Sequence, residues 1–433
     1  LLPKYKDPLL GWFYHYMKNG ETLMDAIYDT ENVPREDPFS QNPVRVFRDI
    51  GTTVFRSGWQ ADDFIFVMRT GPFRNHQFMD QGSFWLSDRN TVFIDRRHGS
   101  TEPYVGAVLY EPWYIQPVSH STILIDGNHQ SQRTGDIRNF APGFDDYAFI
   151  SHFLDGDHAS FVSGDIGRVY WGKVKEMQRN IIYLKPRTLL MLDTVVPVEK
   201  DVDVTLLYQT LHLKDITAGT DVSTINKDGK VLQINHMYPK NLTVNAVETP
   251  HYFYTLLRER PLEREGMLTV TTRTSGIPLV IANLLSTDSD VTYEQGDGFV
   301  WGTVNKAAFC FSTRPGKIYQ QGDITTDALA LCPAGNNTFV ALCTTFNNVN
   351  GLTVDSSKQI TFEVSQVSTE AVSAFKYYIA EVSTVQIGAP EPLESVSVNG
   401  KKIDSSALSG NRKNVSLTLP AGEGEIQLIS RHR

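Results

Sequence analysis

The sequence IIYLKPRTLLML at residues 181–192 gives the strongest indication of the fold. It contains two apolar runs, 181–184 and 189–192, that flank the segment Lys185-Pro186-Arg187. Short apolar runs on either side of a turn are typical of neighbouring antiparallel strands. The stretch therefore predicts a β-hairpin.

Strand-like runs of the same kind recur from about residue 44 onward, and few segments there show a helical pattern. The other clear runs are 64–68, 83–86, 91–94, 121–125, 202–208, 252–257, 268–272, 279–284, 299–304 and 339–344. So many short strands predict stacked sheets rather than a small barrel. The expected fold class is mainly β, with a large antiparallel β-sandwich, or supersandwich.

The two ends of the chain read differently from this middle part. Near the N-terminus, Asp7 and Pro8 favour the start of a helix, and apolar residues at positions 10, 13, 14 and 17 share one of its faces. We expect helices at 8–18 and 21–28 within a helical segment and linker at 1–42. The sandwich should occupy 43–350, and 351–433 should form a smaller β domain or a last sheet layer.

Composition limits the class of protein. A chain of 433 residues is longer than a domain with a single hydrophobic core usually is, so two or three domains are expected. The formal net charge of −9 argues against a nucleic-acid binder, because neutralising phosphates needs a basic face. No stretch is apolar and long enough to span a membrane, and three cysteines are too few for a disulfide framework. The chain begins at Leu1, so we expect a processed or partial product.

One strand-like region carries far more polar groups than a sheet needs. It reads RNHQFMDQGSF at residues 74–84. Two other strand ends offer titratable groups, because Asp95 follows the run 91–94 and His120 precedes the run 121–125. A rigid sheet can bring such groups together, and acid-base chemistry or metal binding requires that convergence.

The order of these motifs resembles a known family. The sequence has N-H-x-x-x-D-x-G-S-F at 75–84, a strand ending in Asp95, H-S-T-I-L-I-D-G at 120–127, and the extended hairpin R-N-I-I-Y-L-K-P-R-T-L-L-M-L-D-T-V at 179–195. From about residue 43 to residue 196 it resembles the C-terminal half of heparinase II/III-like polysaccharide lyases. The resemblance implies that an (α/α) toroid precedes the β-sandwich, and that the expected helix at 8–18 is its last part. A toroid domain or chain would then be needed to complete the enzyme.

The resemblance also implies roles for the polar region. Family members break a glycosidic bond by elimination, in which a base removes the C5 proton of a uronic acid and the substrate carboxylate must be neutralised. His76 is the catalytic candidate, since an imidazole titrates near neutral pH. Strand alternation places Arg74 on the face of His76, so Arg74 ranks above Asn75 and Gln77 as a contact for the substrate. The alternative is that His76 is an ordinary half-buried histidine.

Asp80 has a simpler alternative of its own, because an acid ahead of Gln81 and Gly82 can organise a turn. The segment after Ile94 contains further candidates for contact with the substrate. Tyr104 and Tyr110 could stack on it, and Arg97 could contact it through charge. Each of the two tyrosines could equally well serve packing alone.

A metal site, usually zinc, is a further implication of the resemblance. Asp95 and His120 match two of its three protein ligands, but Phe78 occupies the position of the third. A zinc site needs at least three protein ligands. We therefore favour the metal-free alternative, in which Asp95 and His120 hydrogen-bond directly, and expect no cofactor unless zinc binds there.

Three functions follow, in decreasing order of preference. The first is a lyase that cleaves a uronic-acid-containing polysaccharide, either a glycosaminoglycan such as heparin or heparan sulfate, or alginate. The second is a non-catalytic β-sandwich module that binds acidic glycans, and the third is a metallohydrolase built on Asp95 and His120. The expected partner is an acidic polysaccharide, with neither nucleic acid nor membrane involved. We expect a periplasmic or secreted location in a bacterium, because polymeric acidic sugars are met outside the cytoplasm.

Overall fold

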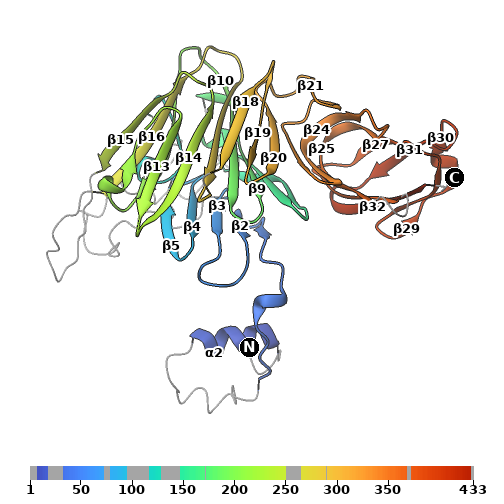
Figure 1. The fold of residues 1–433 in the computed structure, drawn as a ribbon, viewed down its shortest axis with the longest axis horizontal. Coiled ribbons are helices and arrows are strands. Elements are labelled where there is room, and N and C mark those ends of the chain that lie inside the picture. Colours follow the sequence, from blue (N-terminus) through green and yellow to red (C-terminus); the bar gives the residue numbers. More distant parts are fainter. Residues whose placement is uncertain are drawn as a thin grey trace.

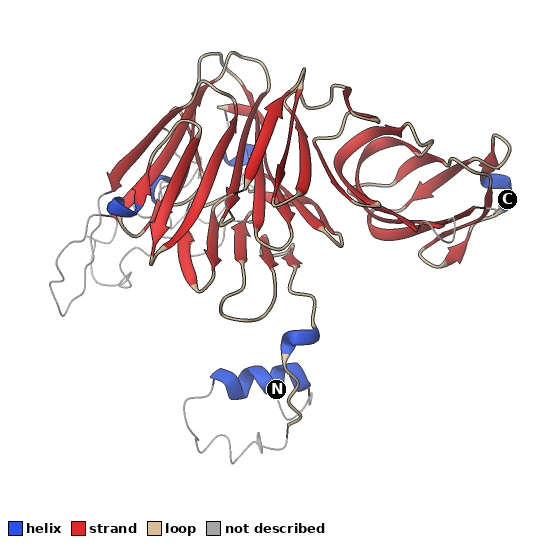
Figure 2. Cartoon of the chain, in the orientation of Figure 1, coloured by secondary structure: helices blue, strands red, loops and turns tan. Residues whose placement is uncertain are grey.

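The structure is a computed structural model that describes residues 7–17, 33–72, 79–94, 117–127, 147–170, 172–249, 265–288, 290–367 and 372–430. Strands dominate it (Figure 2), so the expected mainly β fold is confirmed. Within these residues, no helix has the length and apolar character needed to cross a membrane.

The described N-terminal part contains one α-helix, α2 (Pro8–Met17), close to the range that the sequence predicts, and the short 3₁₀ helix η2 (Pro38–Ser40). Asp7 caps its start, because its Oδ1 accepts the backbone N–H of Leu10 at 2.9 Å. The helix stands apart from the sheets (Figure 1), and Phe13, Tyr16 and Met17 are exposed. The helix expected at 21–28 lies outside the described residues. That α2 is the end of a toroid stays a prediction.

Four antiparallel sheets are formed by the described strands. The first has the order β1 (Arg45–Phe47), β2 (Thr52–Arg56), β3 (Ile65–Arg69), β4 (Phe84–Asp88), β5 (Thr91–Ile94). The second has the order β15 (Thr243–Thr249), β16 (Glu265–Arg273), β11 (Asp203–Thr210), β6 (Ile123–Ile125). The third has the order β12 (Ile216–Thr217), β13 (Val222–Lys227), β14 (Lys230–Tyr238), β17 (Leu279–Ser286), β10 (Thr188–Pro197), β9 (Val174–Leu184), β8 (Ala159–Asp165), β7 (Phe149–Asp155).

The fourth sheet contains the described strands beyond residue 290. Its main path is β18 (Val291–Gln295), β19 (Phe299–Val304), β20 (Ala307–Ser312), β23 (Ala330–Ala334), β24 (Asn337–Asn348), β25 (Thr353–Val367), β26 (Val372–Ile379), β32 (Gly422–Ser430), β28 (Leu393–Val398), β29 (Lys401–Lys402). Side branches add β21 (Tyr319–Gln321), β22 (Ile324–Thr326), β27 (Ser383–Gly388), β30 (Leu408–Ser409) and β31 (Asn414–Leu419). Strands β18 to β20 lie with the sandwich, and the strands from β24 onward curl into the body at the C-terminal end (Figure 1).

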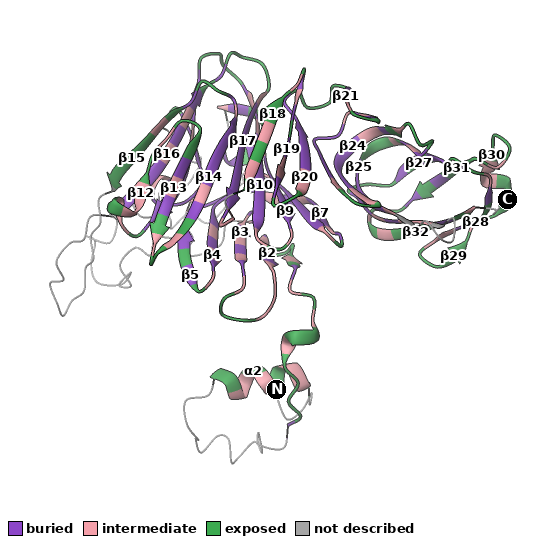
Figure 3. Ribbon diagram, in the orientation of Figure 1, coloured by how far each residue is buried: buried purple, intermediate pink, exposed green. Residues whose placement is uncertain are grey.

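The hairpin β9–β10 lies in the middle layer of a three-layer stack. Leu189 and Met191 of β10 belong to the core that the third sheet shares with the first two sheets. Leu190 and Leu192 point the other way, into the core shared with the start of the fourth sheet. A strand covered on both faces must be apolar at consecutive positions, which explains the uninterrupted run LLML. Figure 3 shows this strand buried over most of its length.

The C-terminal strands have a core of their own, which is built mainly from β24 to β32. Cys310, Cys332 and Cys343 are free, buried thiols in or beside this region. The domain boundary expected near residue 351 stays a prediction.

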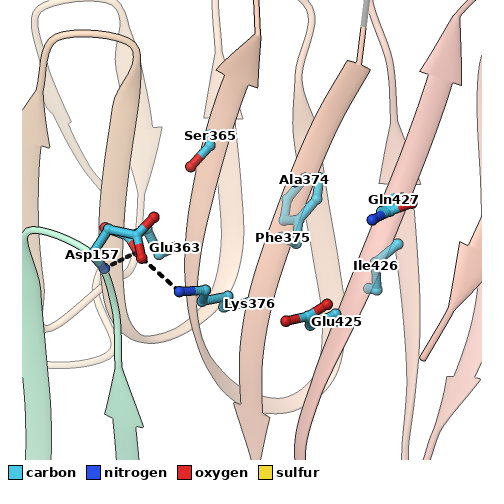
Figure 4. Close-up of a pocket in the computed structure, with 9 residues that line it drawn as sticks. All are labelled: Asp157, Glu363, Ser365, Ala374, Phe375, Lys376, Glu425, Ile426 and Gln427. Atoms are coloured by element: carbon cyan, nitrogen blue, oxygen red, sulfur yellow. Dashed lines mark hydrogen bonds and ion pairs between the residues drawn. The ribbon is translucent and has the colours of Figure 1, made fainter. Parts of the chain in front are cut away.

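The turn between β7 and β8 joins the sandwich to the C-terminal strands. Glu363 of β25 accepts the backbone N–H of Asp157 at 2.5 Å, and its Oε1 lies 2.5 Å from Nδ1 of His158. Nε2 of His158 lies 2.7 Å from the carbonyl oxygen of Cys332. Asp157 also forms an ion pair of 2.6 Å with Lys376 of β26 (Figure 4). These contacts border a polar hollow over β25, β26 and β32.

Candidate active-site region

Most residues that the sequence predicts for the site lie outside the described residues. These are Arg74, Asn75, His76, Gln77, Phe78, Asp95, Arg97, Tyr104 and Tyr110. The structure describes His120, together with the residues that border the other ranges. Those bordering residues show how the sheet arranges the region.

Two of the bordering points lie at the same end of the first sheet. Strand β3 ends at Arg69, where its N–H donates to the carbonyl of Ser83 and its own carbonyl accepts the N–H of Gly82, both at 2.8 Å. Strand β5 runs antiparallel to β4 and ends at Ile94, opposite Leu86. The chain therefore enters the range 73–78 and leaves β5 toward Asp95 from one end of the sheet.

The residues after the range 73–78 form a tight, buried turn. The N–H of Ser83 donates to the carbonyl of Asp80 at 2.9 Å, and Gly82 has a φ of +75°. Asp80 and Gln81 are 2% and 0% exposed. Oε1 of Gln81 accepts the N–H of Gly71 at 2.8 Å, which ties the turn to the far side of the range. Asp80 thus fits the turn-forming role that the sequence offered as its alternative.

His120 lies in the interior next to this turn. It follows the 3₁₀ turn η4 (Pro117–Ser119), its N–H donates to the carbonyl of Pro117 at 3.0 Å, and its side chain is 0% exposed. Two residues later, Oγ1 of Thr122 donates to the carbonyl of Gln81 at 2.5 Å. The segment that follows His120 therefore contacts the end of the polar motif, and a role of His120 in the site stays a prediction.

A buried ion pair connects the two segments. Arg179 and Asp193 face each other across β9 and β10, with side chains 1% and 0% exposed. Nε and Nη2 of Arg179 donate to the two carboxylate oxygens of Asp193 at 2.7 and 3.0 Å. Nη1 donates to the carbonyl of Gly82 at 2.6 Å and lies 3.4 Å from the carbonyl of Ser121. One guanidinium thus contacts the turn after the polar motif and the residue after His120.

The surroundings of Arg179 keep its guanidinium charged. Burial alone lowers the pKa of Arg179, because it strips water from the guanidinium, but the charge and hydrogen bonds of Asp193 outweigh burial and raise that pKa above its usual value. Burial raises the pKa of the nearby Tyr208, so its phenol stays neutral. The ring of Phe84 lies 5.7 Å from Cζ of Arg179 and covers the guanidinium.

Arg179 and Asp193 are not among the predicted site residues, although the sequence carries a signal for their pairing. Each stands seven positions from Pro186, at the centre of the predicted hairpin. Antiparallel pairing around that centre places them opposite each other, and an acid opposite a base inside an apolar hairpin predicts a buried ion pair.

The described residues border the ranges that contain most of the predicted site residues. Among them, no three His, Cys, Asp or Glu side chains are grouped so as to hold a metal ion. Asp95 and Phe78 lie outside the described residues, so the choice between a zinc site and a direct contact of Asp95 with His120 stays a prediction.

Comparison with known proteins identifies the family. Residues 40–275, more than half of the chain, match the family model described as heparinase II/III-like, C-terminal. No curated protein sequence matches the chain.

Several solved structures share the fold. Heparan sulfate lyase HepC from Pedobacter heparinus has a TM-score of 0.52 at 13% identity, over 70% of this chain and 46% of that one. A heparinase III has a TM-score of 0.51 at 10% identity, over 72% and 54%. The chondroitin AC lyase of Streptomyces coelicolor A3, in complex with chondroitin sulphate, has a TM-score of 0.52 at 10% identity, over 99% and 56%.

At such identities the likeness concerns the fold alone, and the chain spans about half the length of these enzymes. The family match rests on the sequence itself, over the residues that form the sandwich. The chain belongs to the heparinase II/III-like family of polysaccharide lyases.

Proposed function

We propose that the protein containing this chain is a lyase that cleaves a uronic-acid-containing glycosaminoglycan, of the heparin or heparan sulfate type, by β-elimination. The family match over residues 40–275 carries the proposal. The printed names of the structural relatives, heparan sulfate lyase and chondroitin AC lyase, support an acidic polysaccharide as the substrate. Alginate is the other uronate polymer to be tested.

The chemistry sets what the site must provide. A base removes the proton at C5, an acid protonates the leaving oxygen at C4, and a cation or donor neutralises the adjacent carboxylate so that the carbanion can form. We assign acid-base work to His76 and the carboxylate contact to Arg74. Asn75 and Gln77, with Arg97, Tyr104 and Tyr110, are assigned to substrate binding.

His120 receives a different role. Its side chain is completely buried, so a polymer in solution cannot reach it in this conformation. We assign it to support of the site, where it lies beside the turn that follows the polar motif. A toroid domain is expected to supply the remaining groups, and a periplasmic or secreted location is part of the proposal.

The test is His76→Ala in the full-length protein. A general acid or base contributes about 10²- to 10⁴-fold to rate, so the initial rate of double-bond formation on heparan sulfate should fall on that scale. The readout is the ultraviolet absorbance of the unsaturated uronate. Unchanged product formation would remove His76 from the mechanism.

A matched control is His212→Ala. His212 is partly exposed at the start of the 3₁₀ turn η6 (Leu213–Asp215) and has no assigned role in the site, so its replacement should leave the rate unchanged. Binding of heparan sulfate by the wild-type protein without any double bond would favour the glycan-binding alternative and overturn the lyase proposal.

A further inference from the structure

The backbone on either side of the candidate site converges on one point inside the sandwich. The turn at Gly82 and the segment at Ser121 come from different sheets, yet both present a carbonyl to the guanidinium of Arg179. Arg179 is held in turn by two hydrogen bonds to Asp193. The pair belongs to the middle layer, and both side chains are buried.

We propose that Arg179 is a positioning residue of the lyase site, oriented by Asp193, which fixes the turn Asp80–Ser83 and the segment His120–Thr122 relative to each other. The inference rests on the proposed function, since it concerns the site where His76 and His120 are placed. It adds a residue that the family match and the sequence motifs assign to no role.

The geometry favours a planar cation at this point. Arg179 has five N–H donors in a fixed fork, so it can bind a carboxylate with one edge and still direct Nη1 at a carbonyl. An ammonium group is a point charge and cannot hold the same set of partners in those directions. Burial of Arg179 and Asp193 excludes water that could replace either contact.

Other hydrogen bonds also hold the segment around Ser121 in place. The N–H of Gln209 donates to Oγ of Ser121 at 3.0 Å, and the phenol of Tyr170 donates to the carbonyl of Ile123 at 2.6 Å. Oγ1 of Thr122 and the carbonyl of Gln81 link the two segments directly. Arg179 adds a further link, which connects both segments to the hairpin β9–β10.

The alternative is that the ion pair only stabilises the core of the sandwich and does not position the site. Buried ion pairs often add little net stability, and their replacement by apolar residues of similar volume is frequently neutral, whereas removing one partner is strongly destabilising. The two readings therefore differ for a double replacement. Arg179→Met with Asp193→Leu should restore the fold, but it leaves the carbonyl of Gly82 without its donor.

The experiment compares R179M, D193L, the double variant R179M/D193L and R179K in the full-length protein. We expect the double variant to recover most of the thermal stability that R179M loses. Its kcat on heparan sulfate should stay about 10²-fold below wild type with KM little changed, since a displacement of about 1 Å costs roughly that factor. R179K should keep the charge but not rescue kcat.

Hydrogen–deuterium exchange provides a readout that does not depend on activity. Peptides covering 79–84 and 119–125 should exchange faster in the double variant and in R179K, while peptides from β24 to β32 should not change. The control is R187M, because Arg187, in the turn before β10, forms an ion pair with the buried Asp88 at the end of β4. That variant should not accelerate exchange in 79–84 and 119–125 selectively.

Each outcome has one meaning. A double variant with wild-type kcat, or with unchanged exchange in both peptides, overturns the positioning role. A wild-type protein without lyase activity refutes the proposed function, while faster exchange in both peptides would still support the mechanical role of Arg179. If the double variant does not fold, R179K decides by the same two measurements.

Discussion

The histidine at position 152 should make the protein less stable in acid. His152 lies on β7, is 7% exposed, and packs edge-on against the ring of Tyr378 at 5.5 Å between centroids. Both of its ring nitrogens are buried without a hydrogen-bond partner in the described part of the chain. The guanidinium of Arg48 stacks on the same Tyr378 ring.

This environment opposes protonation of His152. Burial, and then the charge of Arg48, lower its pKa from 6.5 to about 4. As the pH falls between these two values, the imidazole of His152 therefore becomes protonated in the unfolded chain but stays mostly neutral in the folded chain. At 1.36 kcal/mol for each pKa unit, the loss in free energy of unfolding reaches about 3 kcal/mol near pH 4.

The perturbation is His152→Leu, which removes the titrating group and keeps an apolar side chain of similar size. The free energy of unfolding is measured by urea denaturation for wild type and variant, from neutral pH to about pH 4. Relative to wild type, the variant should gain about 3 kcal/mol over that range. A difference that stays constant with pH, or that moves against the variant in acid, would refute the reasoning.

Three other substitutions have defined outcomes. His158→Gln should lower the free energy of unfolding most below pH about 6.5, and less as the pH rises. Burial alone lowers the pKa of His158, but the ion pair with Glu363 raises that pKa overall, so the wild-type protein gains stability from the pair where the imidazole is protonated. A difference in urea denaturation that does not depend on pH would contradict this. Gly82→Ala should lower the free energy of unfolding by about 1–2 kcal/mol, because φ is +75° and the new Cβ would lie 3.0 Å from Cδ1 of Ile166. An equally stable variant would show that the turn relaxes. Leu190→Ala should cost about 2–5 kcal/mol by the same assay, and a smaller loss would mean that the middle layer collapses around the gap.

The sequence predicts strands well where a run is continuous and bounded by a turn. The hairpin β9–β10 is such a case, and so is β4–β5, whose turn residues Arg89 and Asn90 have positive φ angles. The expected run 252–257 lies outside the described residues.

The sequence pattern does not predict strands β7 and β8, because polar residues interrupt their apolar runs. Ser160 and Ser163 are buried on β8, and Oγ of Ser160 donates to Asp155 at 2.6 Å. The carbonyl of Ser151 accepts the phenol of Tyr378 from the C-terminal strands at 3.0 Å. Partners of this kind are supplied by tertiary structure, so a local pattern does not contain them.

For the candidate site, the sequence indicated that the polar motif and His120 could converge at strand ends, and the structure places Thr122, two residues after His120, against Gln81 of the motif. The sequence did not show how that contact is maintained. The contact of Arg179 with Gly82 and Ser121 depends on the register of β9 with β10 and on the stacking of three layers. Those are properties of the assembled fold, and only the pairing of Arg179 with Asp193 was available from spacing.

The alkylation rates of the three buried thiols can report how often the C-terminal strands open. Burial raises the pKa of Cys310 to about 12 and raises those of Cys332 and Cys343 as well, so hardly any thiolate forms while the strands stay closed. An alkylating reagent can therefore react only with molecules that have opened locally. Cys332 lies in the core shared with the sandwich, whereas Cys310 and Cys343 lie in the C-terminal core. Their separate alkylation rates would reveal whether the two cores open together or one at a time, with no engineered label.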